Sequence, residues 1–398
     1  MCMRISTYDN RSFYAACVTN FLLRVEWGIS TSMLPLYVHE RGGSPLEVGL
    51  IFTIFAGINF FSNLFWGVVS DFFGKRKVFI VLGMAFMVPI FLLMSVQKEI
   101  FLLILLRGST AIFKGAIVPC TWALVSDISP PRKVGRNMGV LSSIEMAGFA
   151  LGPALGGLIT DRLGFAILWI FVAAVCLVGS LVFLFFGSDS PTIKSNPKKS
   201  LFRALKKRES FSKILVLCIS FLVFLFGWSL LGPNLNVFLF DDIGLSRTMV
   251  GMVFLIGTGA ATLIQPIIGS YSDKYGRKLF LILGALSLTF GNIVLFFAQN
   301  LSLVLLAQIL ISNYNIFQFI GSAYISDVVP KKEKGTMLGI FGSMGSLSRS
   351  LGAIVGGYII TITSIRTLTL ISILFPITSI IIVLSLVVES KTLFRNKD

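Results

Sequence analysis

Twelve apolar stretches take up most of this chain, and each is long enough to cross about 30 Å of hydrocarbon as a helix. We expect membrane spans at 14–38, 48–70, 78–96, 100–126, 137–160, 165–187, 214–240, 248–270, 279–298, 302–326, 336–360 and 367–388. Hydrophobic residues make up 55% of the 398 and charged residues 13%, outside the range of a water-soluble domain. Backbone groups in lipid must bond within their own helix or within a closed barrel. Stretches of this length therefore predict an all-α membrane protein.

Two polar motifs occur twice, about two hundred residues apart. The first comprises Gly67, Asp71, Gly74, Lys75 and Arg76, and its second copy comprises Gly269, Asp273, Gly276, Arg277 and Lys278. A shorter motif around Asp127 recurs around Asp327. Two halves of matching layout, both built from membrane spans, are typical of a duplicated transporter. We expect an N-terminal six-helix bundle at 1–187, a basic cytoplasmic linker at 188–213 and a C-terminal six-helix bundle at 214–398.

Lysine and arginine concentrate on one side of the predicted membrane. With both termini in the cytoplasm, the cytoplasmic segments hold about five times as many of these residues as the outside loops, which predicts this orientation in the cell membrane. The net charge of +16 then reflects topology and contact with the lipid bilayer, and no nucleic-acid partner is expected. The linker alternates basic residues with leucine and phenylalanine, which suits a short amphipathic helix on the anionic inner leaflet. A solvated linker that enforces topology is an equally good interpretation.

The sequence offers no recognisable set of catalytic or cofactor-binding residues. Its single histidine, His39, falls in an outside loop, and its five cysteines are scattered without metal-ligand or disulfide spacing. The Gly74-Lys75 pair lacks the spacing and the Ser or Thr of a P-loop, so ATP hydrolysis is not expected. We therefore expect no cofactor, no metal and no enzymatic activity, and transport that is driven by an ion.

The repeated motifs and the six-plus-six layout resemble the major facilitator superfamily of secondary transporters, over nearly the whole chain. The resemblance implies two pseudo-symmetric six-helix bundles. It also implies that Asp71 latches the halves in the outward-facing state, and that Lys75 and Arg76 reach an acid at the end of span 4, here Asp127. Asp273 and Asp327 would form the mirror latch. In physical terms, Gly67 and Gly74 permit close helix approach and a tight turn.

Span 5 carries a second motif, which is similar to the family's antiporter motif and typical of drug:proton exchangers. It comprises Gly139, Gly148, Gly152, Pro153, Gly156 and Gly157. Four of these glycines on one helical strip would let a neighbouring helix pack backbone to backbone, and the proline would kink the helix. Span 11 keeps most of the glycines but has Ser348 and Ala353 at two positions. The alternative interpretation is that the small residues only pack helices.

Ionisable residues deep in spans mark functional sites, because each costs a few kcal/mol to insert and is usually paired. Six are expected here: Arg24, Glu26, Arg107, Lys114, Glu145 and Arg349. In this family spans 1, 4, 7 and 10 line the central cavity. The 1.5 Å rise per residue places Glu26 and Lys114 at nearly the same depth, so we expect them to pair, with Arg107 further out. Arg24 is two residues from Glu26 and should point largely the other way.

Glu26 has two possible roles. It is either a proton carrier, which exchanges its proton when cationic substrate arrives, or one partner of a permanent salt bridge between spans 1 and 4; we favour the carrier. Glu145 is a second candidate, and it could equally pair with Arg349 across the interface between the halves. Arg107 aligns with the family's span 4 arginine linked to proton transfer, although Ala111 replaces the glycine that normally follows it.

The second half has only neutral polar residues and one arginine within its spans. Candidates for the substrate cavity are Trp228, Asn234, Asn236, Gln308, Asn315 and Gln318. Gln308, Asn315 and Gln318 fall on one stripe at helical spacing. Hydrogen bonding to substrate and hydrogen bonding between helices explain them equally well.

The sequence thus predicts a monomeric secondary transporter that works by alternating access and takes a small-molecule substrate and protons as its partners. The favoured function is proton-coupled efflux of small amphipathic or lipophilic compounds. The alternative is a proton-coupled uptake symporter for a sugar, an organic acid or another small solute, with Arg107, Lys114 and Arg349 holding an anion. A membrane sensor or scaffold is a distant third, because the longest soluble stretch is only about 26 residues.

Overall fold

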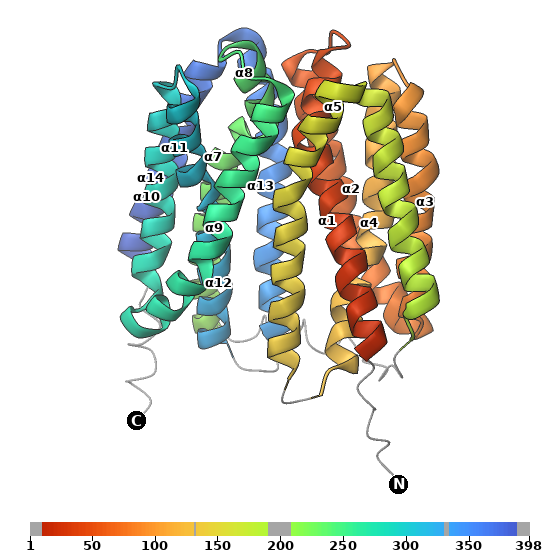
Figure 1. Cartoon of the computed structure of the whole chain (residues 1–398). Coiled ribbons are helices and arrows are strands. Elements are labelled where there is room, and N and C mark those ends of the chain that lie inside the picture. Colours follow the sequence, from red (N-terminus) through yellow and green to blue (C-terminus); the bar gives the residue numbers. More distant parts are fainter. Residues whose placement is uncertain (1–9, 131–132, 190–207, 330–333, 388–398) are drawn as a thin grey trace. The chain divides into compact units, whose positions relative to one another are not determined.

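The computed structural model describes residues 10–130, 133–189, 208–329 and 334–387, whose regular structure is all helix (Figure 1). The helices are α1 (Asn10–His39), α2 (Pro45–Phe73), α3 (Arg76–Val96), α4 (Ile100–Ile128), α5 (Val134–Phe186), α7 (Arg208–Leu231), α8 (Leu235–Asp241), α9 (Arg247–Tyr275), α10 (Arg277–Phe296), α11 (Leu301–Ser312), α12 (Tyr314–Val328), α13 (Lys334–Ile362) and α14 (Ile365–Leu386). The predicted all-α membrane fold is confirmed. Residues 190–207 of the predicted linker lie outside the described residues, so its amphipathic helix stays a prediction there, whereas residues 208–213 already belong to α7.

Ten helical stretches within the described residues are long and apolar enough to cross a membrane. One of them is the 53-residue α5, which contains two predicted spans. Gly164 separates these spans with a φ of 82°, a backbone conformation that glycine adopts without strain. The 30-residue α1 is not among the ten, and it carries Arg24 and Glu26 in its middle. With α1 and the two arms of α5 included, each of the twelve predicted spans has a helical counterpart.

Two predicted spans are each built from two helices. In span 7, α7 ends before Gly232 and α8 begins at Leu235. Pro233 lies in this turn, and a proline in a helix interior both lacks a donor and clashes with the preceding turn. In span 10, α11 ends before Asn313 and α12 begins after it. The backbone N–H of Asn313 donates to the carbonyl of Leu310, three residues earlier, and not to the carbonyl four residues earlier as it would in an α-helix.

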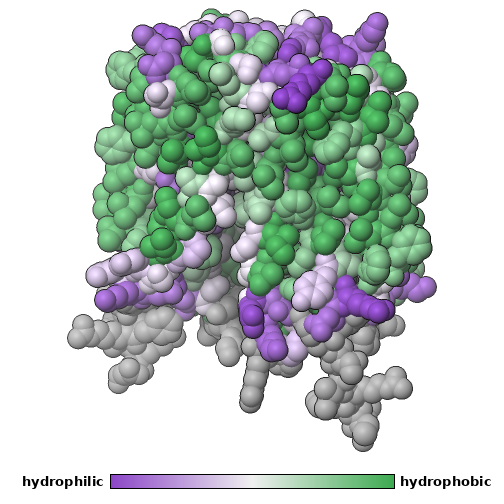
Figure 2. Space-filling view, in the orientation of Figure 1, coloured by the Kyte–Doolittle hydropathy of each residue, from purple (hydrophilic) through white to green (hydrophobic). Residues whose placement is uncertain are grey.

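Large apolar side chains cover the outer faces of the helices. Phe72, Phe185 and Leu263 expose 76%, 73% and 77% of their surface, which water would disfavour and lipid accepts. Figure 2 shows the same pattern: hydrophobic residues cover the visible helices over most of their length, and hydrophilic ones gather near the helix ends. The surface is that of a multi-pass membrane protein.

The described residues pack into two compact units. The first comprises those within Met1–Gly43, Ile54–Ser195 and Ser246–Leu255, and the second those within Ser44–Thr53, Asn196–Leu245 and Ile256–Asp398. In the first unit α1 packs on α4 and α5, and α3 packs on α4 and α5. In the second, α7 packs on α12, α13 and α14, and α10 packs on α11, α12 and α14. The first turns of α2 and of α9 therefore belong to a different unit from the rest of the same helix.

Candidate substrate and proton site

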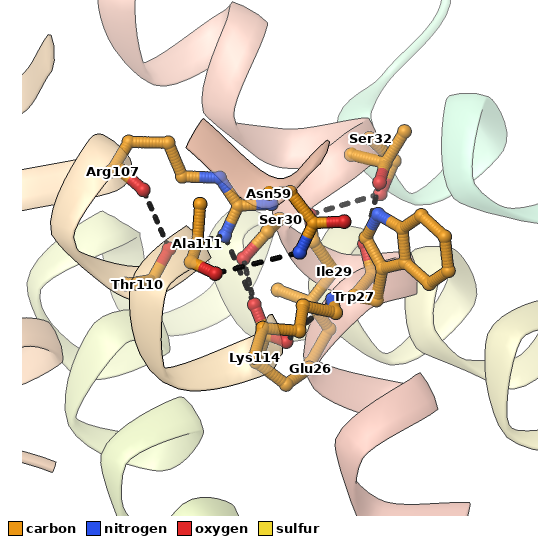
Figure 3. Close-up of polar contacts among 11 residues, drawn as sticks. Glu26, Trp27, Ile29, Ser30, Ser32, Asn59, Arg107, Thr110, Ala111 and Lys114 are labelled. Carbon is orange, nitrogen blue, oxygen red and sulfur yellow. Dashed lines mark hydrogen bonds and ion pairs between the residues drawn. The ribbon is translucent and has the colours of Figure 1, made fainter. Parts of the chain in front are cut away.

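A buried cluster of charges lies between α1 and α4 in the first unit (Figure 3). The Glu26 carboxylate is fully buried, and each of its oxygens meets one base: Arg107 Nη1 lies 3.1 Å from Oε1, and Lys114 Nζ lies 3.2 Å from Oε2. Ser30 donates a further hydrogen bond to Oε1 at 2.9 Å. The two bases are seven positions apart, so they share a face of α4, and Glu26 faces both from α1. A carboxylate removed from water is stabilised here by two cations and a hydroxyl.

Aromatic rings complete the surroundings of the two bases. The Arg107 guanidinium lies 4.1 Å from the ring centre of Phe55, and Lys114 Nζ lies 4.1 Å from that of Trp27. Such cation–π contacts strengthen where water is excluded, as it is around side chains only 1% and 3% exposed. Trp27 thus contacts the lysine that binds Glu26. The sequence contained no cue to this role, because an aromatic residue in a span is common.

Trp27 also connects this cluster to a second ion pair. The Arg24 guanidinium lies 4.7 Å from the Trp27 ring centre, and its Nη2 lies 2.7 Å from Oε2 of Glu145 on α5. Trp122 donates its indole N–H to the other oxygen of Glu145 at 3.0 Å. Three bases and two acids therefore lie in one connected group, with one positive charge in excess.

The predicted pair of Glu26 and Lys114 is present. Arg107 was expected further out, but its long side chain reaches back to the same carboxylate, so Glu26 has two bases. Arg24 makes its ion pair with Glu145 rather than with Glu26. The pairing of Glu145 with Arg349 that we considered concerns residues of different units and stays a prediction. Within the first unit Glu145 binds Arg24, because α1 packs closely along α5 and brings Arg24 to the acid.

The span 5 motif packs α5 against α1. A Cβ atom on Gly152 would lie 2.5 Å from the Val25 carbonyl oxygen and 2.8 Å from the Gly28 Cα. One on Gly148 would lie 2.5 Å from the Phe21 carbonyl oxygen, and one on Gly156 would lie 2.9 Å from a Met33 side-chain carbon. The helices approach more closely than any side chain at these three positions would allow.

The remaining motif positions do not all lie on this strip. Gly157 faces the backbone of Arg247, and the Pro153 carbonyl contacts Gly251, both in the first turns of α9. A Cβ on Gly139 would meet nothing within 4 Å. The expected single strip of four glycines is therefore wrong in its extent, because consecutive residues on a helix point about 100° apart.

The second unit repeats this packing with different residues. Gly352 and Gly356 of α13 press against Ser229 and Leu230 of α7, while Gly357 lies against the Pro45 carbonyl at the start of α2. Ser348, which stands where span 5 has Gly148, donates a hydrogen bond to the Leu222 carbonyl at 2.8 Å. The duplication thus extends to individual helix contacts.

The loop between α2 and α3 binds the end of α4. Gly74 has a φ of 65°, which makes the tight turn there. Arg76 Nη1 lies 2.5 Å from Oδ2 of Asp127, the contact that the family resemblance implied. No contact of Lys75 with an acid occurs among the described residues, Gly67 has open space beside it, and the Asp71 side chain lies outside the described part.

Asp189, which sequence reasoning missed, fixes this loop from the other side. Its Oδ1 accepts hydrogen bonds from the backbone amides of Arg76 at 2.7 Å and Lys77 at 2.6 Å. These are the first two residues of α3, whose amides have no partner within the helix. An acid beside a helix N-terminus also interacts favourably with the helix dipole. Asp189, two residues after the end of span 6, thereby caps the start of span 3.

The mirror loop between α9 and α10 has its own ion pairs. Gly276 makes the turn with a φ of 104°. Arg277 Nε lies 2.9 Å from Oδ2 of Asp327 on α12, and the same guanidinium contacts Asp273. Lys278 donates to the Leu384 carbonyl at 2.8 Å, and Gly269 packs against Phe319. Each half thus binds its loop arginine to the acid that follows its fourth span.

A further charged cluster joins α1, α5 and the start of α9. Arg247 contacts Glu40 and lies 3.5 Å from Oδ1 of Asp161. Oδ2 of Asp161 accepts hydrogen bonds from the amide and the hydroxyl of Thr248, at 2.7 and 2.6 Å, and so caps α9. These residues sit in predicted outside loops, where charge is ordinary, so the sequence carried no signal for them.

The predicted cavity residues of the second half have different surroundings. Trp228 stacks on Tyr314, with ring centres 4.2 Å apart. Gln308 is buried, donates to Ser312 and packs against Gly257 of α9. Asn234 and Asn236 are buried next to the turn between α7 and α8, whereas Asn315 and Gln318 are partly exposed on α12. The turn at Asn313 separates Gln308 from the other two members of the predicted stripe.

No group of three or more His, Cys, Asp and Glu side chains that could hold a metal ion occurs in the part of the chain that the structure describes.

Several known proteins share this sequence pattern. The uncharacterized MFS-type transporter MJ1560 of Methanocaldococcus jannaschii is 24% identical over 379 residues, 92% of this chain and 96% of that protein. The multidrug resistance protein MdtG of Proteus mirabilis is 29% identical over 314 residues, 74% and 72% of the two chains. The quinolone resistance protein NorA of Staphylococcus aureus is 24% identical over 358 residues, 87% and 88% of the two chains.

Solved structures share the fold. A variant of the nucleoside transporter NupG matches with a TM-score of 0.82 at 14% identity, over 94% of this chain and 99% of that one. A bacterial homologue of the human lysosomal transporter Spinster matches with a TM-score of 0.78, also at 14% identity, over 95% and 96%. The family model of the Major Facilitator Superfamily matches residues 16–225 and again 217–397. This chain therefore belongs to the Major Facilitator Superfamily, as a multi-pass membrane transporter of small molecules and not an enzyme.

Proposed function

We propose that this protein exports small amphipathic or lipophilic compounds in exchange for protons, with Glu26 as the proton carrier. The observation that carries the proposal is the Glu26 carboxylate, fully buried between Arg107 and Lys114 in the first unit. It is one of two acids in a group that also holds three bases. We further propose that the protein works as a monomer in the cell membrane, with both termini in the cytoplasm.

Exchange at Glu26 follows from electrostatics. A proton on the carboxylate removes the negative charge that holds Arg107 and Lys114, so protonation and the two ion pairs exclude each other. A cationic group that approaches the same carboxylate competes with the proton for it, and this competition is the basis of antiport. An anionic group that approaches the two bases instead favours the protonated acid, which is the basis of symport. The charge of the substrate thus decides the direction of coupling.

Two further observations support export. The span 5 glycines resemble the antiporter motif, and three of them pack along the part of α1 that carries Glu26. Two of the relatives described above are named as a multidrug resistance protein and a quinolone resistance protein. Removal of drugs from the cell is the simplest activity that matches these names and the motif together.

One observation favours the alternative, proton-coupled uptake of a small anion. The group around Glu26 has one base more than it has acids, and protonation of Glu26 would raise the excess. A substrate carboxylate would then offset the charge. The two functions predict opposite proton movements in the same assay.

We would measure proton flux in proteoliposomes with an acidic lumen and a lumenal pH dye. Lipophilic cations, zwitterions and organic anions are added outside, one at a time. Antiport predicts that added substrate moves inward while protons leave, so the lumen becomes more alkaline. Glu26→Gln should abolish this response. The matched control is Glu99→Gln, an exposed acid at the start of α4.

The outcomes separate the possibilities. Substrate-triggered alkalinisation that disappears only in Glu26→Gln supports antiport and places the proton on Glu26. An unchanged response in Glu26→Gln keeps antiport but removes Glu26 as its carrier, and Glu145→Gln is then the next variant. In a second experiment the lumen is neutral, the exterior is acidic and an anion is added outside. Acidification of the lumen would then contradict export and support uptake.

A further inference from the structure

We propose that Trp228, Tyr314 and Arg349 of the second unit form a binding site for the acidic group of an aromatic or otherwise apolar substrate. The proposal rests on the transport function proposed above, and it specifies the chemical class of substrate. It concerns residues that the Glu26 cluster does not contain.

The three residues come from three helices. Trp228 of α7 stacks on Tyr314 at the start of α12, with a ring-centre distance of 4.2 Å and an interplanar angle of 24°. Arg349 lies on α13, which packs on both α7 and α12. All three side chains are partly buried, so each keeps some accessible surface. A stacked pair of aromatic rings and a guanidinium thus come from three helices that all pack on one another.

The register of α13 directs Arg349 toward α7. Gly345 and Gly352, four residues before and three residues after it, both press against α7 side chains. Residues three and four positions apart share a helix face, so the backbone of Arg349 lies on the face of α13 that packs on α7. It lies near the midpoint of the 29-residue α13, which is the depth of the membrane centre for a span of this length.

Arg349 has no carboxylate counter-ion among the described residues of its own unit. Among the described residues of that unit, no carboxylate lies within ion-pair distance of its guanidinium, whereas Arg277 has two. Arginine stays charged at any physiological pH, and a charge at mid-membrane depth is usually paired or part of a substrate path. The charge is therefore available to a ligand that carries its own negative group.

The duplication supports a ligand site at this place. Trp27 of the first half corresponds to Trp228, 201 residues later, and Lys114 corresponds to Tyr314, 200 residues later. In the first unit the base at this position contacts the tryptophan and binds an internal acid, Glu26. In the second unit the tryptophan stacks on a tyrosine, and Arg349 of the neighbouring α13 has no acid partner among the described residues of that unit. At corresponding places, the first half thus has a base that is paired with an internal acid, whereas the second half has a base without an acid partner among the described residues of its unit.

The three side chains indicate which chemical class of ligand would bind. A guanidinium binds a planar carboxylate or another oxyanion through paired hydrogen bonds, and the tyrosine hydroxyl can donate one more. The indole and phenol rings favour an aromatic or apolar body. A purely cationic compound would be repelled by Arg349. The expected ligand is therefore an amphipathic compound with an acidic group. A zwitterion, whose cationic group can compete with a proton, fits the proposed antiport, whereas a simple acid fits the alternative of uptake.

The test compares two probes that differ only in charge. The full-length protein in lipid nanodiscs is titrated against dansylglycine, which carries a carboxylate, and dansylglycinamide, which is neutral, with fluorescence anisotropy as the readout. Empty nanodiscs correct for partition into lipid. We expect the acid to bind at least about tenfold more tightly than the amide, the usual difference for a charge-assisted contact.

Variants assign the preference to Arg349. Arg349→Gln should bring the ratio of the two dissociation constants to about one while the amide binds as before, and Arg349→Lys should keep part of the preference. Trp228→Leu should weaken both probes by a similar factor. Arg366→Gln, an exposed arginine at the start of α14, should change neither value. A purely structural role of Arg349 would not alter the ratio.

Two results would overturn the proposal. The first is a wild-type protein that binds acid and amide equally, and this measurement does not depend on the folding of any variant. The second is a preference for the acid that survives in Arg349→Gln, or in Arg349→Lys if the glutamine variant cannot be purified, at the full wild-type ratio. Because binding is measured without a pH gradient, failure here leaves proton exchange through Glu26 intact, and failure of proton exchange leaves this result intact.

Discussion

The structure allows the two possible roles of Glu26 to be separated by a charge-balanced pair of variants. Glu26→Gln keeps the size of the side chain but leaves Arg107 and Lys114 buried without their counter-ion. Removal of one partner from a buried ion pair typically costs about 3–5 kcal/mol. Adding Lys114→Met removes one of the two unpaired charges and retains a side chain of similar length. We expect the double variant to recover about 2 kcal/mol of that loss, in the range of coupling between contacting residues.

Unfolding can be followed with a dye that reacts with thiols. Cys17, Cys120, Cys176 and Cys218 are buried in the helices, so they react as the protein opens. A loss of 1 kcal/mol lowers the melting temperature by roughly 2–4 °C for a domain the size of one unit. Glu26→Gln should therefore melt about 10 °C below the wild type, and the double variant should recover about half of this difference.

Transport by the same two variants decides the role. If Glu26 is the proton carrier, the double variant regains stability but not proton exchange, because no acid replaces the lost one. If the ion pair only holds α1 against α4, exchange returns together with stability. A Glu26→Gln variant that melts within about 2 °C of the wild type would refute the energetic reasoning, since the buried bases would then not need the carboxylate.

Three further predictions concern contacts elsewhere in the first unit. Gly152→Ala should lower the free energy of unfolding by about 2 kcal/mol, because the new Cβ would overlap the backbone of α1. Gly139→Ala adds a Cβ that meets nothing within 4 Å, so it should be neutral or slightly stabilising in the same thermal assay. Equal effects of the two alanines would contradict this. Asp189→Asn should speed hydrogen exchange of the first two amides of α3 and cost about 1 kcal/mol, and unchanged exchange would show that the cap is dispensable. Asp161→Asn should speed exchange in the first turn of α9 by weakening its contact with Arg247; no difference from wild type would mean that other contacts hold this turn.

The spans and the pair of Glu26 and Lys114 were predictable from simple regularities. A span is set by the length of an apolar run, and the depth of a residue is set by the rise of a helix. Two bases seven residues apart must share a face of α4. These are properties of single helices, so a sequence contains them without any knowledge of packing.

Contacts that depend on which helices are neighbours were not predictable in this way. The sequence could say that Arg24 points away from Glu26, but the choice of Glu145 as its partner requires the close packing of α1 on α5. Asp189 caps a helix more than one hundred residues earlier, so no local capping pattern marks it. The turn at Asn313 lacks an adjacent proline or glycine, the residues that usually announce such a break.

Two helices each have their first turns in one unit and the rest of their length in the other, and this affects how the chain could be divided into fragments. The first turns of α2 group with the second unit, and the first turns of α9 group with the first unit. Two separately expressed fragments, cut within the central linker, would each hold a helix end whose packing partners are on the other fragment. Neither fragment would then contain a complete unit, and each would stabilise the other when produced in the same cell. A chimera with a related transporter would likewise have to match Gly157 of one parent to Arg247 of the other, and Gly357 to Pro45.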